Sequence, residues 1–453
     1  MNQTTIAAVA TPPGEGGIAV IRVSGEEAIS VCDRVFSGKA QLSRAKSHSL
    51  HYGNIIENGH VVDEVLAAVM RAPASYTGEN VVEISCHGGV YVTQKILALL
   101  LANGAVLATP GEFTKRAFLN GKLDLSQAEA VIDLIQSETG DAATLSVNQL
   151  KGKLSGAIED QRRKLLELAA HLDAMADFPD EGIGALSEEA VKQELFALRS
   201  ALSHMCDTAD QGRMIRSGIN TVIIGKPNVG KSSLLNALSG TDRALVTDTA
   251  GTTRDVIEER VRLGSARLNI FDTAGIRQDA EAIEELGIKK ALTYVEQADL
   301  VFFVLDASRP FDTEDAEIAE LIQDKKVILL INKADLVTGI KVPEELSHLP
   351  VIEISAKTGL GIEALSAQLE AMFRLGEVAE KHEAAIINMR HKQAISAAIS
   401  ELDSALSALQ NGVPLDFLSV DLRNAIGLLG EITGQTVSDE IIDEIFSRFC
   451  LGK

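Results

Sequence analysis

The pattern of apolar and polar residues changes along the chain, and residues 1–120 form its first part. Short runs rich in β-forming residues, at 61–70 and 80–86, are separated by Gly and Pro, whereas residues 91–101 have the apolar spacing of a helix. This mixture predicts a compact N-terminal α+β domain over residues 1–120.

In the second part, apolar residues recur at three- and four-residue steps, with one gap at Gln161. The recurring residues are Val147, Leu150, Leu154, Ile158, Leu165, Leu168, Leu172 and Met175. This spacing predicts one long amphipathic helix or two joined ones. We expect Phe178-Pro179-Asp180 to end it and a further helix to follow over residues 188–206. Residues 121–216 are therefore interpreted as the first part of a helical domain.

Between residues 217 and 378, short apolar runs alternate with helical segments. The runs are residues 221–224, 268–271, 300–305, 327–331 and 351–354. Such runs are typical of buried parallel strands, so this part predicts an α/β domain. The helical pattern returns over residues 379–453. We therefore predict a multidomain chain, in which the α/β domain is inserted into a discontinuous α-helical domain that follows the α+β domain.

Length and charge narrow the possible functions. The 453 residues correspond to about three domains. The net charge of −22 disfavours a general nucleic-acid coat protein, which needs a cationic surface, but leaves room for a local basic patch. The N-terminal residues lack the pattern of a secretory signal, and no apolar stretch is long enough to cross a membrane, so we expect a cytoplasmic protein. Four widely spaced cysteines are typical of reduced thiols.

A phosphate-binding motif opens the α/β domain. Gly225-Lys226-Pro227-Asn228-Val229-Gly230-Lys231-Ser232 fits G-x-x-x-x-G-K-[ST], follows an apolar strand and precedes a helical run. Its glycines allow backbone N–H groups to surround phosphates. We expect Lys231 to reach the outer phosphates and the Ser232 hydroxyl to bind Mg²⁺, a cation that prefers oxygen ligands. The predicted nucleotide contacts in this loop are Asn228, Val229, Gly230, Lys231, Ser232 and Ser233.

Three further motifs specify guanine, and each follows its own strand. Asp272-Thr273-Ala274-Gly275 can sense the γ-phosphate through the Gly275 backbone. In Asn332-Lys333-Ala334-Asp335, the Asp335 carboxylate can accept the paired donors of guanine, which adenine lacks. Ser355-Ala356-Lys357 can contact the carbonyl oxygen of the base through its backbone. This ordered set resembles the translation-factor-related class of P-loop GTPases.

The catalytic residues differ from those of many small GTPases. Ile276 occupies the position where those proteins have a water-orienting Gln. We hypothesise that Glu284 orients the water. From composition alone, a solvated helix face is the better interpretation of the acidic stretch 281–285, and the family resemblance described below reverses that preference. Thr253 is expected to join Ser232 on Mg²⁺. Asn228 can hold a monovalent cation or be a structural residue of a tight turn. The predicted nucleotide contacts in this switch region are Thr247, Asp248, Thr249, Ala250, Gly251, Thr252 and Thr253.

Additional segments, spread over the whole chain, resemble one known family, the tRNA uridine-modification GTPases called MnmE or TrmE. The segments are Ala10-Thr11-Pro12-Pro13-Gly14 with Gly16-Gly17, Arg22-Val23-Ser24-Gly25, Tyr76-Thr77-Gly78-Glu79, His87-Gly88-Gly89, Pro110-Gly111-Glu112-Phe113-Thr114, Arg116 to Leu125, Gly251-Thr252-Thr253-Arg254-Asp255 and Phe449-Cys450-Leu451-Gly452-Lys453. Their occurrence together is highly specific.

The resemblance implies a function. The N-terminal domain would bind formyl-tetrahydrofolate and form a homodimer. GTP hydrolysis would require K⁺-dependent dimerisation of the GTPase domains. A flavin-containing partner of the MnmG/GidA family would join in a heterotetramer-like complex. Together they would install an aminomethyl or carboxymethylaminomethyl group at C5 of the wobble uridine of certain tRNAs, with folate as the one-carbon donor.

The resemblance also implies site residues. Arg22, Glu83, Lys122 and Lys453 match folate contacts. Asn228, Thr247, Thr249 and Thr252 match the K⁺ site, Glu284 the water-orienting acid, and Arg277 a position near the catalytic switch. Without the resemblance, Glu83 would be an outward-facing polar residue and Lys453 a frayed tail. Cys450 is read as a small buried side chain, with a nucleophilic role as the minority interpretation.

Two alternatives remain at this point. A ribosome-assembly GTPase of the Era or Der type shares the cation-using switch sequence, but such proteins usually add a basic RNA-binding module or a second GTPase domain. A signalling switch would not need the domain at residues 1–120.

Overall fold

The structure is a computed structural model that describes residues 4–177, 187–241, 259–271, 294–336, 342–373 and 388–453. The chain forms two compact units, each built from several separate segments. The first unit contains residues 1–136, 149–199 and 397–453, and the second contains residues 137–148 and 200–396. Each unit is described by itself.

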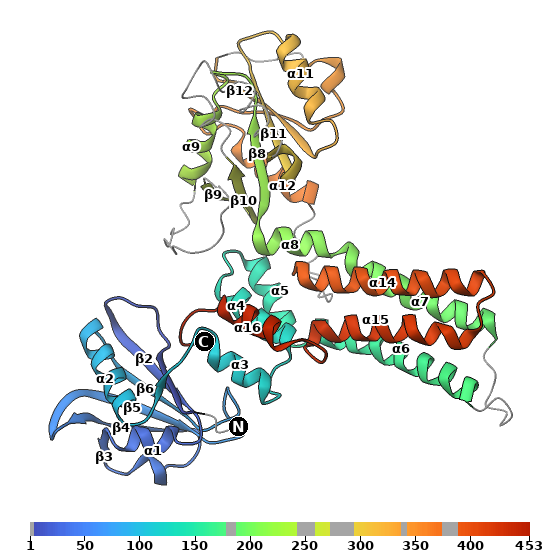
Figure 1. Ribbon diagram of the computed structural model, residues 1–453. Helices are drawn as coiled ribbons and strands as arrows, with labels where there is room; N and C mark the ends of the chain where they lie inside the picture. Colours follow the sequence, from blue (N-terminus) through green and yellow to red (C-terminus); the bar gives the residue numbers. More distant parts are fainter. Residues whose placement is uncertain (1–3, 178–186, 242–258, 272–293, 337–341, 374–387) are drawn as a thin grey trace, which may run out of the picture. The chain divides into compact units, whose positions relative to one another are not determined.

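A seven-stranded sheet dominates the N-terminal part of the first unit, in the order β3-β4-β5-β6-β2-β1-β7 (Figure 1). The strands are β1 (Ile6–Val9), β2 (Gly16–Ser24), β3 (Phe36–Gly38), β4 (Ser49–Glu57), β5 (His60–Met70), β6 (Val81–Gly88) and β7 (Val106–Leu107). All neighbours pair antiparallel except β1 and β7. The strands predicted at 61–70 and 80–86 are β5 and β6.

Helices α1 (Ala28–Asp33) and α2 (Val90–Ala102) pack on the sheet, and α2 confirms the helix predicted at 91–101. Ile21 and Ile84 on the strands and Ile96 and Leu100 on α2 are fully buried in one apolar core. The opposite-facing residues of β2 and β6, including Arg22 and Glu83, are therefore outside this core.

The rest of the first unit is helical. Its elements are η1 (Leu42–Arg44), α3 (Glu112–Leu119), α4 (Leu125–Ile135), α6 (Lys153–Asp177), α7 (Glu188–Asp207, up to residue 199), α14 (Met389–Gln410, from residue 397), η4 (Leu415–Phe417), α15 (Leu418–Thr433) and α16 (Asp439–Ser447). Asp124 begins α4 with a capping box: its carboxylate accepts the Gln127 N–H, and the Gln127 side chain accepts the Asp124 N–H.

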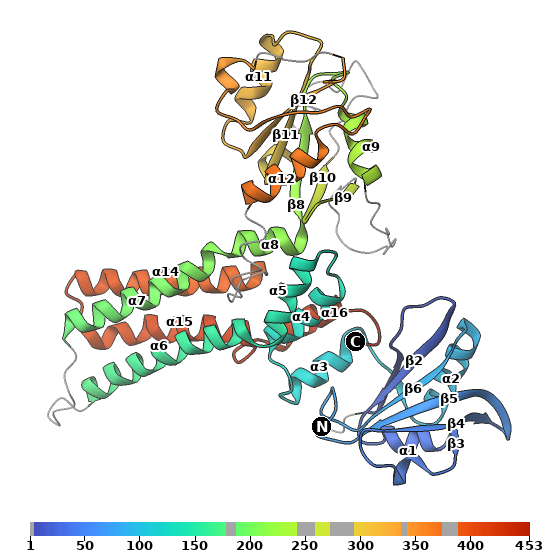
Figure 2. The ribbon, with the colours of Figure 1, turned by 180° about the vertical axis from the view of Figure 1, so that it is seen from behind.

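The long amphipathic pattern corresponds to two helices. α5 (Gly140–Leu150) and α6 are separated at Gly152, whose φ of +80° is a left-handed conformation. α6 ends at Asp177, directly before the predicted stop. The predicted apolar stripe of α6 is buried and packs along α15, a helix from the far end of the chain (Figures 1 and 2). The two helical segments on either side of the inserted domain therefore pack together.

The second unit contains a six-stranded sheet in the order β13-β12-β11-β8-β10-β9. The strands are β8 (Ile219–Ile224), β9 (Glu259–Leu263), β10 (Ala266–Phe271), β11 (Leu300–Asp306), β12 (Val327–Asn332) and β13 (Val351–Glu353). The five predicted strands are all present and parallel. β9 was not predicted, because its sequence ERVRL contains only two apolar residues; it pairs antiparallel with β10 at the sheet edge.

Helices cover both faces of this sheet, so its central strand β11 is apolar up to its last residue, Asp306: Phe302 and Phe303 point to opposite faces and are both fully buried. The helices are the part of α5 up to Asn148, α8 (Ala209–Ser217), α9 (Lys231–Thr241), α11 (Thr313–Leu321) and α12 (Ile362–Phe373), with η3 (Glu344–Leu346). Ala142 and Leu145 of α5 enter the core of this unit, a long-range contact that the sequence did not reveal. Within the described residues, no helix is long and apolar enough to cross a membrane.

Candidate functional sites

The predicted phosphate-binding loop joins β8 to α9 and has a backbone that only specific residues can adopt. Gly225 and Gly230 have φ values of +147° and +101°. A methyl group on Gly225 would lie 2.3 Å from the Val304 carbonyl oxygen, and one on Gly230 would lie 2.2 Å from Nδ2 of Asn332. Asn228 also has a left-handed backbone, with φ +64°. The sequence motif therefore forms the expected tight turn.

Lys231 and Ser232 occupy the first turn of α9. The Lys231 ammonium donates to the carbonyl oxygens of Gly225 (2.7 Å) and Lys226 (2.8 Å), so the loop wraps around it. Ser232 and Ser233 are exposed. Backbone N–H groups at the start of a helix bind anions, and here they lie beside a cation and an accessible hydroxyl. This arrangement fits a Mg²⁺-bound nucleotide phosphate.

Asn332 connects the three guanine-site segments that the structure describes. Its side chain is buried, with 2% of the residue exposed. Nδ2 donates to the Val229 carbonyl oxygen at 2.8 Å, and Oδ1 accepts the Ala356 N–H at 3.0 Å. One amide thus fixes the phosphate loop, the end of β12 and the Ser355-Ala356-Lys357 segment relative to each other.

Lys333 makes a second connection. Its ammonium donates to the Asn228 carbonyl oxygen at 3.0 Å and to Oδ2 of Asp306 at 2.6 Å. Asp306 has only 2% of its side chain exposed, and Ser308 donates to its other oxygen. Burial alone would raise the pKa of Asp306, but the Lys333 and Ser308 hydrogen bonds outweigh it and hold the pKa below its usual range.

The residues predicted to contact the base differ in exposure. Asp335 and Lys357 are exposed, whereas Ser355 is buried and forms the turn that presents the Ala356 backbone. The structure thus brings together the predicted residues of the phosphate loop, of Asn332-Lys333-Ala334-Asp335 and of Ser355-Ala356-Lys357. Asp306 was not predicted; an acid at the end of a central parallel strand was the available signal.

Several predicted site residues lie outside the described residues, and their predictions stay untested. They are Thr247, Asp248, Thr249, Ala250, Gly251, Thr252, Thr253, Asp272, Thr273, Ala274, Gly275, Arg277 and Glu284.

A second candidate site lies on the N-terminal sheet. Nε of Arg22 donates to Oε1 of Glu83 at 2.8 Å, across the register that pairs β2 with β6. The guanidinium lies 5.4 Å from the ring centre of Tyr76 and 5.5 Å from that of Phe113. Two of the predicted folate contacts therefore lie together, and two aromatic rings hold the cation.

The C-terminal segment is packed against this site. Nη1 of Arg22 lies 3.5 Å from the Gly452 carbonyl oxygen, and the Phe113 N–H donates to the Lys453 oxygen at 3.2 Å. Gly452 is buried, with φ +88°. Lys453 is thus not a frayed tail. Nζ of Lys122 donates to the Pro73 carbonyl oxygen at 3.3 Å.

A buried ionic network supports the same region. Arg116 pairs with Glu79 (3.2 Å) and with Glu112 (2.8 Å), and Glu79 also accepts the Ser24 hydroxyl at 2.7 Å. Burial alone would raise the pKa of Glu112, but hydrogen bonds from Thr109 and Arg116 lower it. The network ties the end of β2 and residue 79 to α3, the helix that carries Phe113.

The cysteines differ from one another in exposure. Cys32 and Cys86 are buried, and burial raises the pKa of Cys86 to about 11. Cys450 is exposed, so the prediction of a small buried side chain is wrong. The reason is that Phe446 and Phe449 fill the adjacent core.

Two family models match the chain. The one described as "GTP-binding protein TrmE N-terminus" matches residues 5–122, and the one described as "MnmE helical domain" matches residues 125–450. Proteins named tRNA modification GTPase MnmE are similar over their whole length. That of Acetivibrio thermocellus is 46% identical over 100% of this chain and 99% of its own, and that of Clostridioides difficile is 46% identical over 99% of both chains. That of Listeria welshimeri is 42% identical over 100% of both.

Among solved structures, a GDP·AlF4⁻-bound Era variant from Aquifex aeolicus is similar to this chain at 30% identity. The match covers 35% of this chain and 56% of that one, with a TM-score of 0.26.

Proposed function

The chain belongs to the MnmE family of tRNA modification GTPases, and from this premise we propose that it couples GTP hydrolysis to modification of the wobble uridine of certain tRNAs. The product is an aminomethyl or carboxymethylaminomethyl group at C5. The observation that supports the proposal is that one chain holds both a phosphate-loop motif linked through Asn332 to the Ser355-Ala356-Lys357 segment and a separate cationic cluster at Arg22.

In the nucleotide site, the residues of this chain bind and orient the substrate. The turn around Gly230 and the start of α9 present N–H groups to the phosphates. Lys231 moves from the loop carbonyls to the outer phosphates, and Asp335 reads the guanine edge. Ser232 and Thr253 would hold Mg²⁺, which would neutralise phosphate charge; the exposed Ser232 hydroxyl at the helix start fits that role.

Hydrolysis is proposed to depend on potassium and on dimerisation of the GTPase domains. Asn228, Thr247, Thr249 and Thr252 would hold K⁺, which would supply positive charge where other GTPases use an arginine finger. The left-handed backbone of Asn228 and its exposed side chain fit a ligand at the loop surface. In this proposal, Glu284 would orient the attacking water and Arg277 would act near the catalytic switch.

The N-terminal site is proposed to bind formyl-tetrahydrofolate, which would supply the one-carbon unit. Its residues fit such a ligand. Arg22, Lys122 and Lys453 are cations suited to a glutamate tail, and Glu83 can accept the paired N–H donors of a pterin. The Arg22–Glu83 pair is only partly exposed, at 15% and 30% of the two side chains, so a ligand there exchanges one set of charge-assisted hydrogen bonds for another.

The proposed assembly is a homodimer that acts in the cytoplasm with a flavin-containing protein of the MnmG/GidA family, in a heterotetramer-like complex, on tRNA. The family matches on both sides of the GTPase domain argue against a ribosome-assembly GTPase of the Era or Der type, because they assign the flanking regions to this family.

The decisive experiment is mass spectrometry of tRNA nucleosides from cells that lack this protein. We expect the C5-modified wobble uridine to disappear; unchanged nucleosides would refute the tRNA role. GTP hydrolysis in KCl compared with NaCl, and isothermal titration with formyl-tetrahydrofolate, test the cation and the folate separately. Equal rates in the two salts, or no heat of binding, would remove the corresponding part of the proposal.

A further inference from the structure

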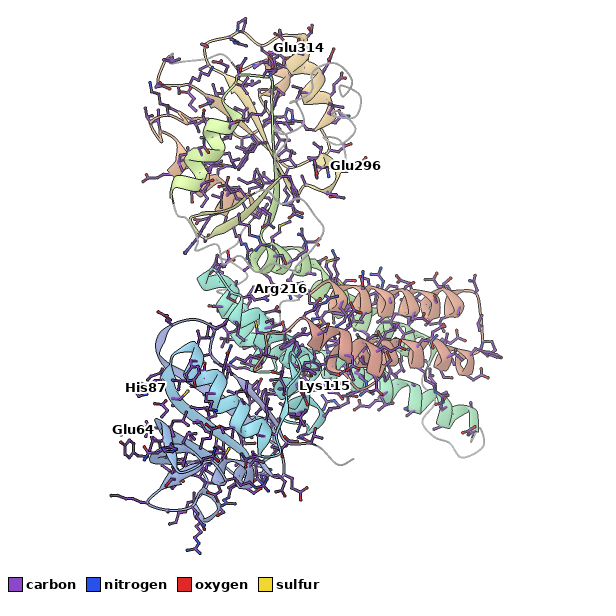
Figure 3. The ribbon with its side chains drawn as sticks, turned by 60° about the vertical axis from the view of Figure 1, so that its left-hand side comes forward. Glu64, His87, Lys115, Arg216, Glu296 and Glu314 are labelled. Atoms are coloured by element: carbon purple, nitrogen blue, oxygen red, sulfur yellow. The ribbon has the colours of Figure 1, made fainter. Side chains whose placement is uncertain are left out.

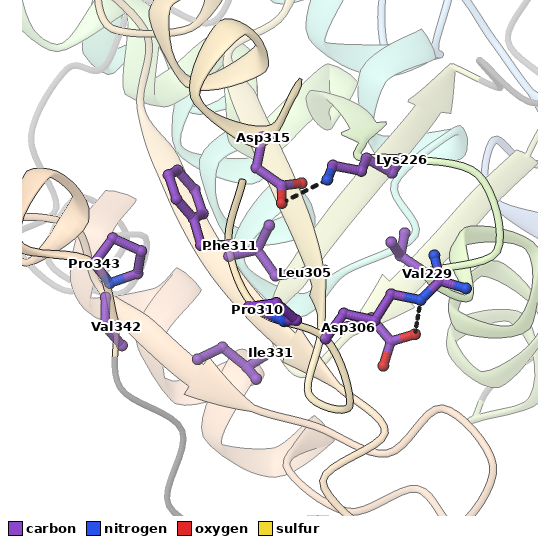
Figure 4. Close-up of a pocket in the computed structure, with 11 residues that line it drawn as sticks. Lys226, Val229, Leu305, Asp306, Pro310, Phe311, Asp315, Ile331, Val342 and Pro343 are labelled. Atoms are coloured by element: carbon purple, nitrogen blue, oxygen red, sulfur yellow. Dashed lines mark ion pairs between the residues drawn. The ribbon is translucent and has the colours of Figure 1, made fainter. Parts of the chain in front are cut away.

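Lys226, the second residue of the phosphate-binding loop, is held by a helix far along the chain. Its ammonium forms ion pairs with Asp312, the N-cap of α11, and with Asp315 at 2.9 Å (Figure 4). Only 12% of the Lys226 side chain and 7% of that of Asp315 are exposed. Burial alone would lower the pKa of Lys226, but the hydrogen bonds that its ammonium donates to the two carboxylates outweigh this effect and raise the pKa.

On this side the loop borders an open space. A cavity of about 310 Å³ lies behind it. The lining residues include Lys226, Val229, Leu305, Phe311, Ile331 and Pro343. Beside this cavity, the ion pairs from Lys226 to Asp312 and Asp315 join the loop to α11. A second ion pair at the cavity, between Asp306 and Arg309, is longer, at 3.8 Å.

The main chain at residues 226–228 contacts or contains residues predicted to act in the nucleotide site, Lys231 and Asn228. The Lys226 carbonyl oxygen holds the ammonium of Lys231, and two residues later Asn228 adopts its left-handed backbone. The Asn228 carbonyl oxygen in turn accepts a hydrogen bond from Lys333. Residues 226–228 are therefore anchored at both ends, by Lys226 to α11 and by Lys333 to the end of β11.

We propose that Lys226 is a positioning residue for GTP hydrolysis, and that its ion pairs with Asp312 and Asp315 hold the Asn228 segment in the geometry that catalysis requires. This inference rests on the proposed role of Asn228. The phosphate-binding residues at 230–232 have further support, from α9 and from the bond between Asn332 and Val229. Loss of the anchor therefore affects turnover more than nucleotide binding.

The test uses full-length Lys226→Met, which keeps the length of the side chain and removes its charge. We expect kcat for GTP in KCl to fall roughly tenfold, because small misplacements at a catalytic site are costly. The affinity for a fluorescent GDP should change less than threefold, and half-saturation by K⁺ should need a higher concentration. Lys226→Arg should restore kcat to near that of the wild type, since it keeps both ion pairs.

The matched variants are Asp315→Asn and Glu314→Gln. Each removes one negative charge from the first turn of α11, but Glu314, which is labelled in Figure 3, is exposed and is not one of the two carboxylates paired with Lys226. Asp315→Asn should reproduce the Lys226→Met defect and Glu314→Gln should not. A folded Lys226→Met protein with wild-type kcat, or equal defects in both acid variants, would overturn the inference. If the wild type itself shows no K⁺ preference, the cation proposal fails, while the comparison of kcat values still decides the role of Lys226.

Discussion

At the residue scale, the side chain of Asn332 is the main link within the nucleotide site. Replacing it by Ala leaves the Val229 carbonyl and the Ala356 N–H without their partner. A buried group left in this way costs about 1–3 kcal/mol. We therefore expect Asn332→Ala to lower both the melting temperature and the affinity for a fluorescent GDP. Asn236→Ala, at an exposed position of α9, is the control and should change neither quantity. Unchanged GDP affinity in Asn332→Ala would contradict the linking role.

We expect the contribution of Asp306 to the free energy of unfolding to depend on pH. Its pKa is lower in the folded protein than in the unfolded chain, because of the hydrogen bonds from Lys333 and Ser308. The ionised carboxylate therefore stabilises the fold above the unfolded pKa of about 4, and this contribution is lost as the pH falls through the folded pKa. Asp306→Asn should lower the free energy of unfolding at pH 7, with a difference from the wild type that shrinks on acidification below about pH 4. Denaturant unfolding at several pH values measures it. If the difference in free energy of unfolding grows on acidification, the ionised Asp306 carboxylate does not stabilise the fold as proposed.

At the scale of elements, apolar periodicity was a good guide to helices and parallel strands. All five predicted strands of the GTPase domain and the ends of α6 and α7 agree with the structure within a few residues. Local pattern was insufficient where tertiary contacts decide the structure. The polar edge strand β9 depends on its pairing with β10, and α5 belongs with the second unit because Ala142 and Leu145 enter its core.

In the candidate sites, too, local sequence predicted some features, whereas others depend on contacts between distant parts of the chain. Glycine spacing predicted the phosphate loop, because positive φ values and close approaches need Gly at fixed positions. The carboxylate partners of Lys226 and Lys333 lie far from them along the chain, at Asp306, Asp312 and Asp315, and no local sequence rule connects them. The resemblance to a family placed Arg22 and Glu83 in one site; the register between β2 and β6 supplies the physical reason.

The C-terminal segment provides a prediction at this scale. A methyl group on Gly452 would lie 2.3 Å from the Val9 carbonyl oxygen, so Gly452→Ala should displace residues 450–453 from β1. Because Arg22 contacts the Gly452 carbonyl, the proposed folate binding should weaken together with thermal stability. Gly412→Ala is the matched control: Gly412 also has a positive φ, +74°, but nothing lies within 4 Å of the added methyl group. Equal effects of the two substitutions on folate binding would show that backbone strain, rather than the position of the C-terminal segment, is responsible.

At the scale of the whole molecule, each unit is assembled from segments separated in sequence, and each candidate site lies within one unit. The residues that contact Arg22 come from 76, 83, 113 and 452, all in the first unit, and those around Asn332 come from 229 and 356, both in the second. The units also have separate apolar cores. Binding of one ligand should consequently stabilise mainly the unit that contains its site.

Differential scanning calorimetry of the full-length protein tests this separation. We expect two transitions. GDP with Mg²⁺ should raise only one of them, and formyl-tetrahydrofolate only the other, since a ligand at a hundred times its Kd stabilises the unit that binds it by about 2.7 kcal/mol. For units of this size such a gain corresponds to several degrees, at roughly 2–4 °C per kcal/mol. Lys231→Ala should abolish the GDP shift and leave the folate shift intact, whereas Glu83→Gln should do the reverse. A single transition that both ligands raise would mean instead that the two units unfold cooperatively, because each ligand then stabilises the whole native chain by mass action.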